Sequence, residues 1–436
     1  MEKTFKYVDY LWDEKKAADL GDDQVALFLY RSNILGADLR ITNYGGGNTS
    51  CKTIEKDPLT NEDVEVMWVK GSGGDIGTLT REGIAGLYTE RLRSLKNVYK
   101  GIEDEDRMVG LFNHCIYDLN SKAPSIDTPL HGLLPFKHID HLHPDALIAV
   151  AAAKDSEQVT KEIWGDTMGW VPWQRPGFDL GLQLEKCLEE NPGIRGIVLG
   201  SHGLFTWGDT SYECYMNSLD VIETASEYIE KKVKEQGEVF GGKKIDSLPS
   251  SERKEKAAEL LPLLRGLASS ENRMIGHFTD SDTVLEYINS NDLERLAPMG
   301  TSCPDHFLRT KIQPLILKLD PSEDLSDPEI EDMTTALKAS KQATEQELKR
   351  IEQEREAEIT LVQSLRVIQE STRGISKERT TVLNKFRTVR EQARAIREER
   401  DAINKNVPPP LEIIEQRLVQ THRRLATIPN DLAKMP

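Results

Sequence analysis

Three histidines stand at spacings suited to binding one metal ion. His141 and His143 form a His-x-His pair, and His202 follows another apolar run in a glycine-flanked turn. Side chains two residues apart on a strand point to the same face, so the first two imidazoles are expected to converge. Three neutral imidazoles suit a catalytic Zn²⁺ that keeps one position open for substrate. The spacing alone leaves open the alternative that these histidines are only hydrogen-bonded.

Two glycine-rich segments, 45–50 and 71–75, combine backbone N–H groups with hydroxyl side chains. Turns of this kind can cradle a phosphate. Residues 71–77 read G-x-G-x-x-x-G, and no earlier strand begins a βαβ unit there, so dinucleotide binding is not favoured. Taken alone, a segment of this kind is more often an ordinary tight loop than an anion site.

A carboxylate also lies close to the histidine cluster in sequence. Asp127 precedes His141 in the context Pro-Ser-Ile-Asp-Thr-Pro, and an acid beside a metal-bound carbonyl compound can shuttle protons. The alternative is that Asp-Thr-Pro forms an ordinary turn or cap. A Cys-x-x-His spacing at 303–306 has no second pair and is interpreted as structural.

The elements that must position these residues alternate between strands and helices. Apolar runs bounded by glycine or proline predict buried strands at 65–70, 146–150 and 196–200. Helical periodicity predicts helices at 23–34, 83–94, 179–190 and 212–234. Strands interleaved with helices indicate an α/β domain, which we place at 1–330.

The composition changes after residue 330. Residues 332–405 lack Trp and Pro and are dense in Glu, Lys, Arg and Gln. A 4-3-4-3 spacing of apolar residues, broken at one seam position by Arg400, predicts a coiled-coil seam. It is made of Val382, Phe386, Val389, Ala393, Ile396 and Ile403. We therefore expect a charged coiled-coil helix over 331–405 and, after the prolines at 408–410, a Pro-broken helix or tail over 406–436.

Net charge and cysteine content disfavour nucleic-acid-binding, membrane and secreted proteins. The net charge of −17 disfavours binding to nucleic acid or to anionic membranes, and no apolar run is long enough to span a bilayer. The first residues lack an apolar signal core. Five scattered cysteines without a CxxC pair indicate reduced thiols. These features predict a cytoplasmic protein.

Together, the motifs occur in the order found in a known family. They are Gly46-Gly-Asn-Thr-Ser50, Lys70-Gly-Ser-Gly-Gly74, Ser125-Ile-Asp-Thr-Pro-Leu-His131, His141-Leu-His-Pro-Asp145 and Ser201-His-Gly203. This set resembles the class II aldolase/adducin family. Longer strings at 36–45, 173–179 and 301–311 resemble the aldolase half of bifunctional rhamnulose-1-phosphate aldolase/lactaldehyde dehydrogenases. The resemblance spans about residues 5–328 and leaves the coiled-coil segment outside the family.

The resemblance implies a three-layer α/β/α sandwich around a largely antiparallel sheet. It also implies one Zn²⁺ per subunit, held by His141, His143 and His202. Asp127 takes the place of the catalytic acid/base, which is Glu in shorter relatives. The substrate phosphate would be bound by Asn48, Ser50, Ser72, Gly73 and Ser125.

The resemblance further implies a reaction and an assembly. The reaction is cleavage of L-rhamnulose 1-phosphate to dihydroxyacetone phosphate and L-lactaldehyde by zinc-stabilised enediolate chemistry. The expected partners are a sugar phosphate and further copies of the chain, a tetramer by resemblance, with the coiled coil as a possible contributor. No dinucleotide fingerprint or Tyr-x-x-x-Lys pair follows residue 328, so no dehydrogenase activity is expected.

Three other interpretations remain open at this stage. A sugar-phosphate epimerase or dehydratase of the same fold would use the same three histidines. A non-catalytic, adducin-like scaffold would keep the fold without the chemistry. In the third interpretation the chain is chiefly an assembly protein that works through its coiled coil.

Overall fold

The computed structural model describes residues 4–43, 45–269, 273–303 and 313–317, and six isolated residues beyond them. The residues of the predicted seam, from Val382 to Ile403, lie outside the described residues. So do the tail at 406–436 and His306 of the Cys-x-x-His spacing. The chain divides into two compact units. The first comprises 1–237 with 301–311, and the second comprises 238–300 with 312–436.

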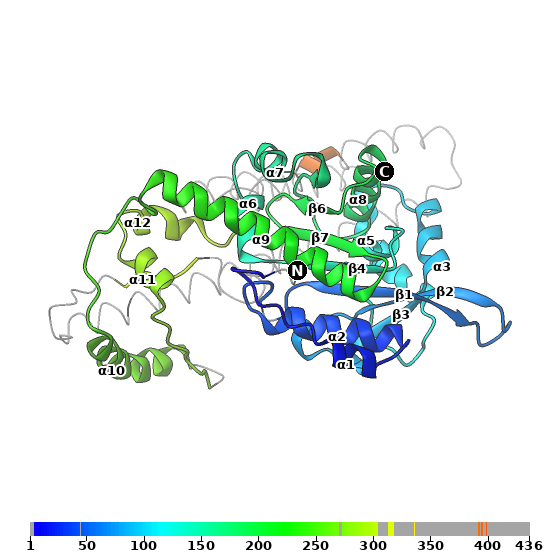
Figure 1. Cartoon of the computed structure of the whole chain (residues 1–436), viewed down its shortest axis with the longest axis horizontal. Coiled ribbons are helices and arrows are strands. Elements are labelled where there is room, and N and C mark those ends of the chain that lie inside the picture. Colours follow the sequence, from blue (N-terminus) through cyan, green and yellow to red (C-terminus); the bar gives the residue numbers. More distant parts are fainter. Residues whose placement is uncertain are drawn as a thin grey trace, which may run out of the picture. The chain divides into compact units, whose positions relative to one another are not determined.

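A mixed sheet forms the centre of the first unit. Within the described residues it has seven strands in the order β3-β2-β1-β4-β7-β6-β5 (Figure 1). All neighbours pair antiparallel except β5 and β6, which confirms the largely antiparallel sheet. The strands are β1 (Asn48–Lys56), β2 (Asp63–Lys70), β3 (Ile84–Tyr88), β4 (His138–Leu142), β5 (Gly169–Val171), β6 (Gly196–Leu199) and β7 (Gly203–Gly208).

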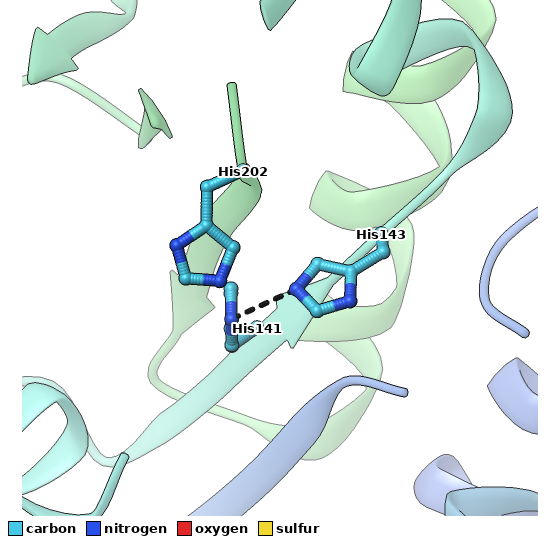
Figure 2. Close-up of side chains that lie close together, drawn as sticks. All are labelled: His141, His143 and His202. Atoms are coloured by element: carbon cyan, nitrogen blue, oxygen red, sulfur yellow. Dashed lines mark hydrogen bonds between the residues drawn. The ribbon is translucent and has the colours of Figure 1, made fainter. Parts of the chain in front are cut away.

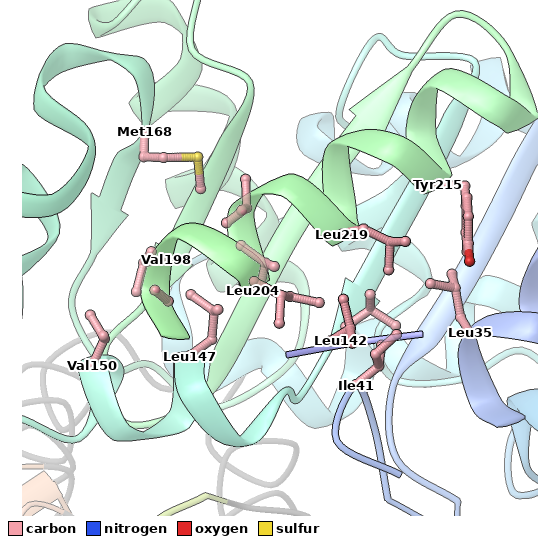
Figure 3. Packing of buried hydrophobic residues seen from close by; sticks show 14 of the residues in the cluster. Leu35, Ile41, Leu142, Leu147, Val150, Met168, Val198, Leu204, Tyr215 and Leu219 are labelled. Atoms are coloured by element: carbon pink, nitrogen blue, oxygen red, sulfur yellow. The ribbon is translucent and has the colours of Figure 1, made fainter. Parts of the chain in front are cut away.

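One face of the sheet, which we call the back face, is covered mainly by α2 (Gln24–Ala37) and α9 (Ser211–Gln236). Leu142 of β4 and Leu204 of β7 point to this face and pack against Leu219 of α9 (Figure 3). Helices α6 (Asp145–Ala151) and α7 (Ser156–Trp164) extend the same apolar cluster.

The opposite, front face is covered by α3 (Thr89–Ser94), α5 (Thr128–Gly132) and α8 (Phe178–Glu190). Ile139 and Phe205, which alternate with the back-face leucines along their strands, pack there against Leu130 of α5. Alternation along each strand therefore buries both faces of the sheet. The result confirms the three-layer α/β/α arrangement.

The expected strand at 146–150 is wrong, because these residues belong to α6. Pro144 is extended at the N-cap, and Asp145 places an acid in the first turn. Leu147, Val150 and Ala151 then share one buried face at helical spacing. A short apolar run has no periodicity that separates a buried strand from a buried helix, and only the packing decides between them.

The expected helix at 83–94 is also wrong in its first half. Residues 84–88 form β3, and helix α3 begins only at Thr89. All five residues of β3 are buried, so the polar alternation that marks a strand is missing. Gly86 lets the side chain of Trp68 lie across the strand, because a Cβ there would come within 2.8 Å of the Trp68 ring. The predicted strands at 65–70 and 196–200 and the predicted helices at 23–34, 179–190 and 212–234 are confirmed.

In the second unit the described residues form α10 (Ser250–Ala268), α11 (Asp282–Ile288) and α12 (Leu293–Leu296). Arg253 of α10 forms an ion pair with Asp280 at 2.8 Å. In the part of the chain that the structure describes, no helix is long and apolar enough to cross a membrane.

Candidate metal centre

His141 is fixed on β4 at the front face of the sheet. Its Nδ1 lies 3.0 Å from the carbonyl oxygen of Leu204 on β7. A carbonyl only accepts hydrogen bonds, so Nδ1 carries the proton and the lone pair lies on Nε2. The imidazole also stacks on Phe205, with 4.4 Å between ring centroids. This second contact fixes the plane of the ring, as expected of a metal-ligating histidine.

The two other imidazoles approach from the loops at the same end of the sheet. His143 follows β4 directly, and His202 sits in the tight β6–β7 turn, where Ser201 adopts a left-handed φ of 54°. Gly203 follows this turn and packs against the His143 ring. A Cβ on Gly203 would lie 2.5 Å from the Cδ2 atom of His143. The absence of a side chain at this position therefore makes room for His143.

The three rings converge on one point (Figure 2). One nitrogen from each lies within 4.8 Å of the others, and the Nε2 atoms of His141 and His143 are 3.1 Å apart. Burial beside the other two imidazoles holds the pKa of His202 well below its usual value, which keeps this ring neutral. Its buried Nδ1 has no hydrogen-bond partner among the described residues. The donor set fits a divalent cation with nitrogen ligands.

Asp127 lies at the N-terminus of α5, on the front face beside this cluster. Its neighbour on β1 is Asn48, which pairs with His141 across the β1–β4 ladder. Asn48 Nδ2 donates to Asp127 Oδ2 at 3.4 Å, and Ser125 Oγ donates to the same oxygen at 3.3 Å. The structure therefore brings three of the predicted site residues, Asn48, Ser125 and Asp127, next to the strand that carries His141.

The two glycine-rich turns are joined through Asp75, the last residue of the second turn. Asp75 Oδ2 accepts from Gly45 N at 2.8 Å, which ties the first turn to the second. Ser72 N donates to Ala123 O at 2.8 Å, so the second turn runs beside the chain that leads to Ser125. Ser72 and Gly73 are exposed. The sequence analysis assigned no role to Asp75. The feature that could have indicated one is its position directly after two glycines, where aspartate is common in turns.

His131 is a second residue to which the sequence assigned no role. It is fully buried on α5, and its Nδ1 lies 2.8 Å from Ser50 Oγ. Burial, together with nearby positive charge, holds its pKa well below the usual value. Ser50, predicted to bind phosphate, therefore has its hydroxyl engaged with His131. The available signal was the four-residue spacing from Asp127, which places both side chains on one side of a helix.

A buried charge network lies behind β4, on the back face. Arg31 of α2 is fully buried and donates to Asp140 Oδ1 at 2.9 Å, to His138 Nδ1 at 2.9 Å and to the carbonyl of Ser50 at 2.8 Å. Two side chains of α9, those of Cys214 and Ser218, donate to the other Asp140 oxygen. The network therefore joins α2, α9, β1 and β4 directly behind the histidine cluster.

Comparison with known proteins identifies the domain that carries these residues. The family profile of the Class II Aldolase and Adducin N-terminal domain matches residues 29–229. Residues 29–229 belong to the class II aldolase/adducin family. A second profile, Aldolase class II, second domain, matches residues 255–369. The family likeness thus continues past residue 330, into the segment that the sequence analysis placed outside the family.

A curated relative of this class II aldolase/adducin chain is the "Uncharacterized oxidoreductase YuxG" of Bacillus subtilis (strain 168). The two are 40% identical over 314 residues, which is 72% of this chain and 45% of the relative. The chain thus spans about half the length of that protein.

Solved structures of class II aldolase domains are also similar. The N-terminal class II aldolase domain of a conserved protein from Thermoplasma acidophilum is 30% identical, with a TM-score of 0.46, and the match covers 51% of this chain and 99% of that one. L-Fuculose-1-phosphate aldolase from Thermus thermophilus is 16% identical, with a TM-score of 0.33, over 49% of this chain and 96% of that one.

Proposed function

We propose that this protein is a metal-dependent aldolase that cleaves L-rhamnulose 1-phosphate to dihydroxyacetone phosphate and L-lactaldehyde. The observation that supports the proposal is the convergence of three buried imidazoles beside Asn48 and Asp127, within a class II aldolase/adducin domain. The choice of sugar rests on the longer motif strings described above.

His141, His143 and His202 would hold one Zn²⁺ in this proposal. The ion would act as a Lewis acid that withdraws negative charge from the substrate carbonyl as the carbon–carbon bond breaks. All three imidazoles are buried, burial holds the pKa of His202 well below its usual value, and the Leu204 carbonyl fixes His141. No lysine Schiff base is required.

The phosphate of the substrate would lie against the two glycine-rich turns. Ser72 and Gly73 offer an exposed hydroxyl and an exposed backbone N–H group. The Asn48 amide and the Ser125 hydroxyl, which donate to the Asp127 carboxylate, are the other two donors. These donors bind phosphate without a permanent charge of their own. Ser50, the fifth residue that the resemblance implies, has its hydroxyl engaged with His131.

Asp127 would move the proton. When the C3–C4 bond breaks, the Asp127 carboxylate takes the proton of the C4 hydroxyl, which becomes an aldehyde, and the bonding electron pair passes into the enediolate of the three-carbon fragment. Asp127 returns a proton to carbon C3, which gives dihydroxyacetone phosphate, and removes it in the synthetic direction. The carboxylate accepts hydrogen bonds from Asn48 and Ser125, which orient it for this transfer.

The direct test is release of dihydroxyacetone phosphate from L-rhamnulose 1-phosphate before chelation, after chelation and after Zn²⁺ is added back. Activity that disappears with the chelator and returns with Zn²⁺ supports the proposal. A His141→Ala variant that keeps full activity without metal contradicts it.

Two other results would redirect the assignment. Turnover of a different sugar phosphate in a substrate panel, with the same metal dependence, would favour an epimerase or dehydratase of this family. A folded protein that neither binds Zn²⁺ nor turns over any sugar phosphate would favour the scaffold interpretation.

A further inference from the structure

Helix α5 and strand β1 carry matched pairs of polar side chains. Asp127 and His131 are four residues apart at the start and near the end of α5, so they lie on one side of the helix. Asn48 and Ser50 are two residues apart on β1, so they lie on one face of the sheet. Four helical residues rise about 6 Å and two strand residues about 6.7 Å, so the two spacings agree.

Each residue of the helix pair contacts one residue of the strand pair. Asp127 accepts from Asn48 at 3.4 Å, and His131 Nδ1 lies 2.8 Å from Ser50 Oγ. We call the first contact the outer bond and the second the inner bond. The outer bond is long, and the Asp127 side chain is half-buried. The inner bond is short, and both of its residues are buried.

The inner bond is also held in place by the metal cluster's own packing. The His131 ring lies 5.4 Å from Phe205, and Phe205 stacks on His141 at 4.4 Å. His131 is thus packed between the strand that carries Ser50 and the ring that supports a metal ligand. A buried, short hydrogen bond in such packing constrains a five-residue helix more strongly than a long, half-exposed one.

We propose that Ser50 and His131 are positioning residues that hold α5 against β1, so that the Asp127 carboxylate faces the site beside His141. The consequence for Asp127 rests on its proposed function as the acid/base. The inner bond gives the Ser50 hydroxyl a structural partner, and so a role different from the phosphate contact that the resemblance implies.

Hydrogen exchange in the zinc-loaded, full-length protein tests the positioning directly. The amides of Leu130 and Leu133 donate within α5, to Asp127 O and Pro129 O. In Ser50→Ala these amides are expected to exchange at least about 10-fold faster, because the helix loses its buried contact with β1. Unchanged exchange of these amides would overturn the proposal.

Ser32→Ala is the matched control. Ser32 is a buried serine of α2 whose hydroxyl lies 2.7 Å from Thr49 Oγ1. Thr49 precedes Ser50 on β1, and its side chain points to the back face of the sheet. The substitution removes a similar bond from the same strand and is expected to leave α5 exchange unchanged. Equal acceleration in both variants would mean general loosening of β1 and would also overturn the proposal.

His131→Asn and His131→Leu keep the proposal testable if Ser50→Ala does not fold. The Asn amide places a nitrogen near the position of the His131 Nδ1, whereas Leu removes the hydrogen bond. Slow α5 exchange retained in His131→Asn and lost in His131→Leu supports the inner bond as the cause. The same exchange rate in both variants contradicts it.

Kinetics separates positioning from phosphate binding. Ser50→Ala is expected to lower kcat about 10-fold with little change in KM, and to cause no further loss in an Asp127→Asn background, because it acts through Asp127. If Ser50→Ala instead raised KM, and by the same factor with Asp127 present and in the Asp127→Asn background, Ser50 would be a phosphate-binding residue. That result would overturn the proposal. A wild-type protein without aldolase activity would contradict the proposed function, while the exchange experiment would still decide the inner bond.

Discussion

At the scale of single residues, burial determines which groups of this site carry charge. His138 is buried beside the Arg31 guanidinium, and the loss of solvation together with that positive charge lowers its pKa to about 2. His131 and His202 are shifted in the same direction by burial. These imidazoles are therefore neutral at physiological pH, the form in which histidine accepts hydrogen bonds and binds metals.

The shifted histidine predicts how stability depends on pH. Unfolded His138 takes up a proton below about pH 6.5, whereas folded His138 stays neutral down to about pH 2. The free energy of unfolding should therefore fall as the pH drops below about 6.5, by up to about 1.4 kcal/mol per pH unit for this group. Urea unfolding of chelator-treated protein at several pH values measures the slope, and His138→Asn should reduce it. An equal slope in both proteins would contradict the assignment.

Asp127 allows a test of the acid/base role at the same scale. Asp127→Asn keeps the size and one hydrogen-bonding oxygen but removes the group that transfers protons. We expect kcat to fall by a factor of about 10²–10⁴, with the zinc content unchanged. Steady-state kinetics together with metal analysis checks both points. Loss of zinc from this variant would instead make Asp127 a metal ligand.

At the scale of elements, the β6–β7 turn decides where two of the histidines lie. It carries His202 itself, and it makes room for His143 through Gly203. The turn is narrow because Leu199 pairs directly with Gly203. The convergence of the three histidines thus depends on backbone geometry as much as on the side chains themselves.

Gly203→Ala tests this dependence. The added methyl would lie 2.5 Å from His143 Cδ2 and 2.6 Å from Leu142 O, so His143 must move. We expect zinc affinity to fall about 10- to 100-fold, as for other losses of support around a ligand. Titration of the apoprotein with Zn²⁺ measures it. Gly110→Ala is the control, because a Cβ at Gly110 meets nothing within 4 Å.

Sequence patterns predicted some elements well and others poorly. The long amphipathic helices α8 and α9 were predicted close to their ends, because one face of each meets solvent and the apolar residues repeat with helical period. The short, largely apolar elements β3 and α6 were assigned wrongly. In these elements every side chain, or nearly every one, is apolar, so the contrast on which periodicity depends is missing.

At the scale of the whole molecule, assembly remains a prediction. The family likeness and the seam in the C-terminal segment both lead us to expect a homo-oligomer, with a tetramer implied by the resemblance. The seam residues lie outside the described part of the chain, so their contribution is judged from the sequence.

Charge placed in the seam tests its role in assembly. Val389→Asp combined with Ile396→Asp should lower the oligomeric mass measured by light scattering if the seam joins chains, because buried carboxylates oppose association. Gln392→Asp, at an exposed position between them, is the control. An unchanged mass in the double variant would contradict a role for the seam in assembly.

The sequence by itself predicted the class of fold and singled out the three histidines as candidate ligands. The alternation of side chains along a strand is a local rule, and it predicted that His141 and His143 would meet, although His143 lies one residue past the end of β4. The tertiary structure decided which groups meet: His202 joins them through the β6–β7 turn, Ser50 contacts His131 rather than remaining open, and Arg31 reaches Asp140 behind the site. These contacts link residues up to 109 positions apart, and no local pattern encodes them, because they arise only when α2, α5 and the sheet pack together.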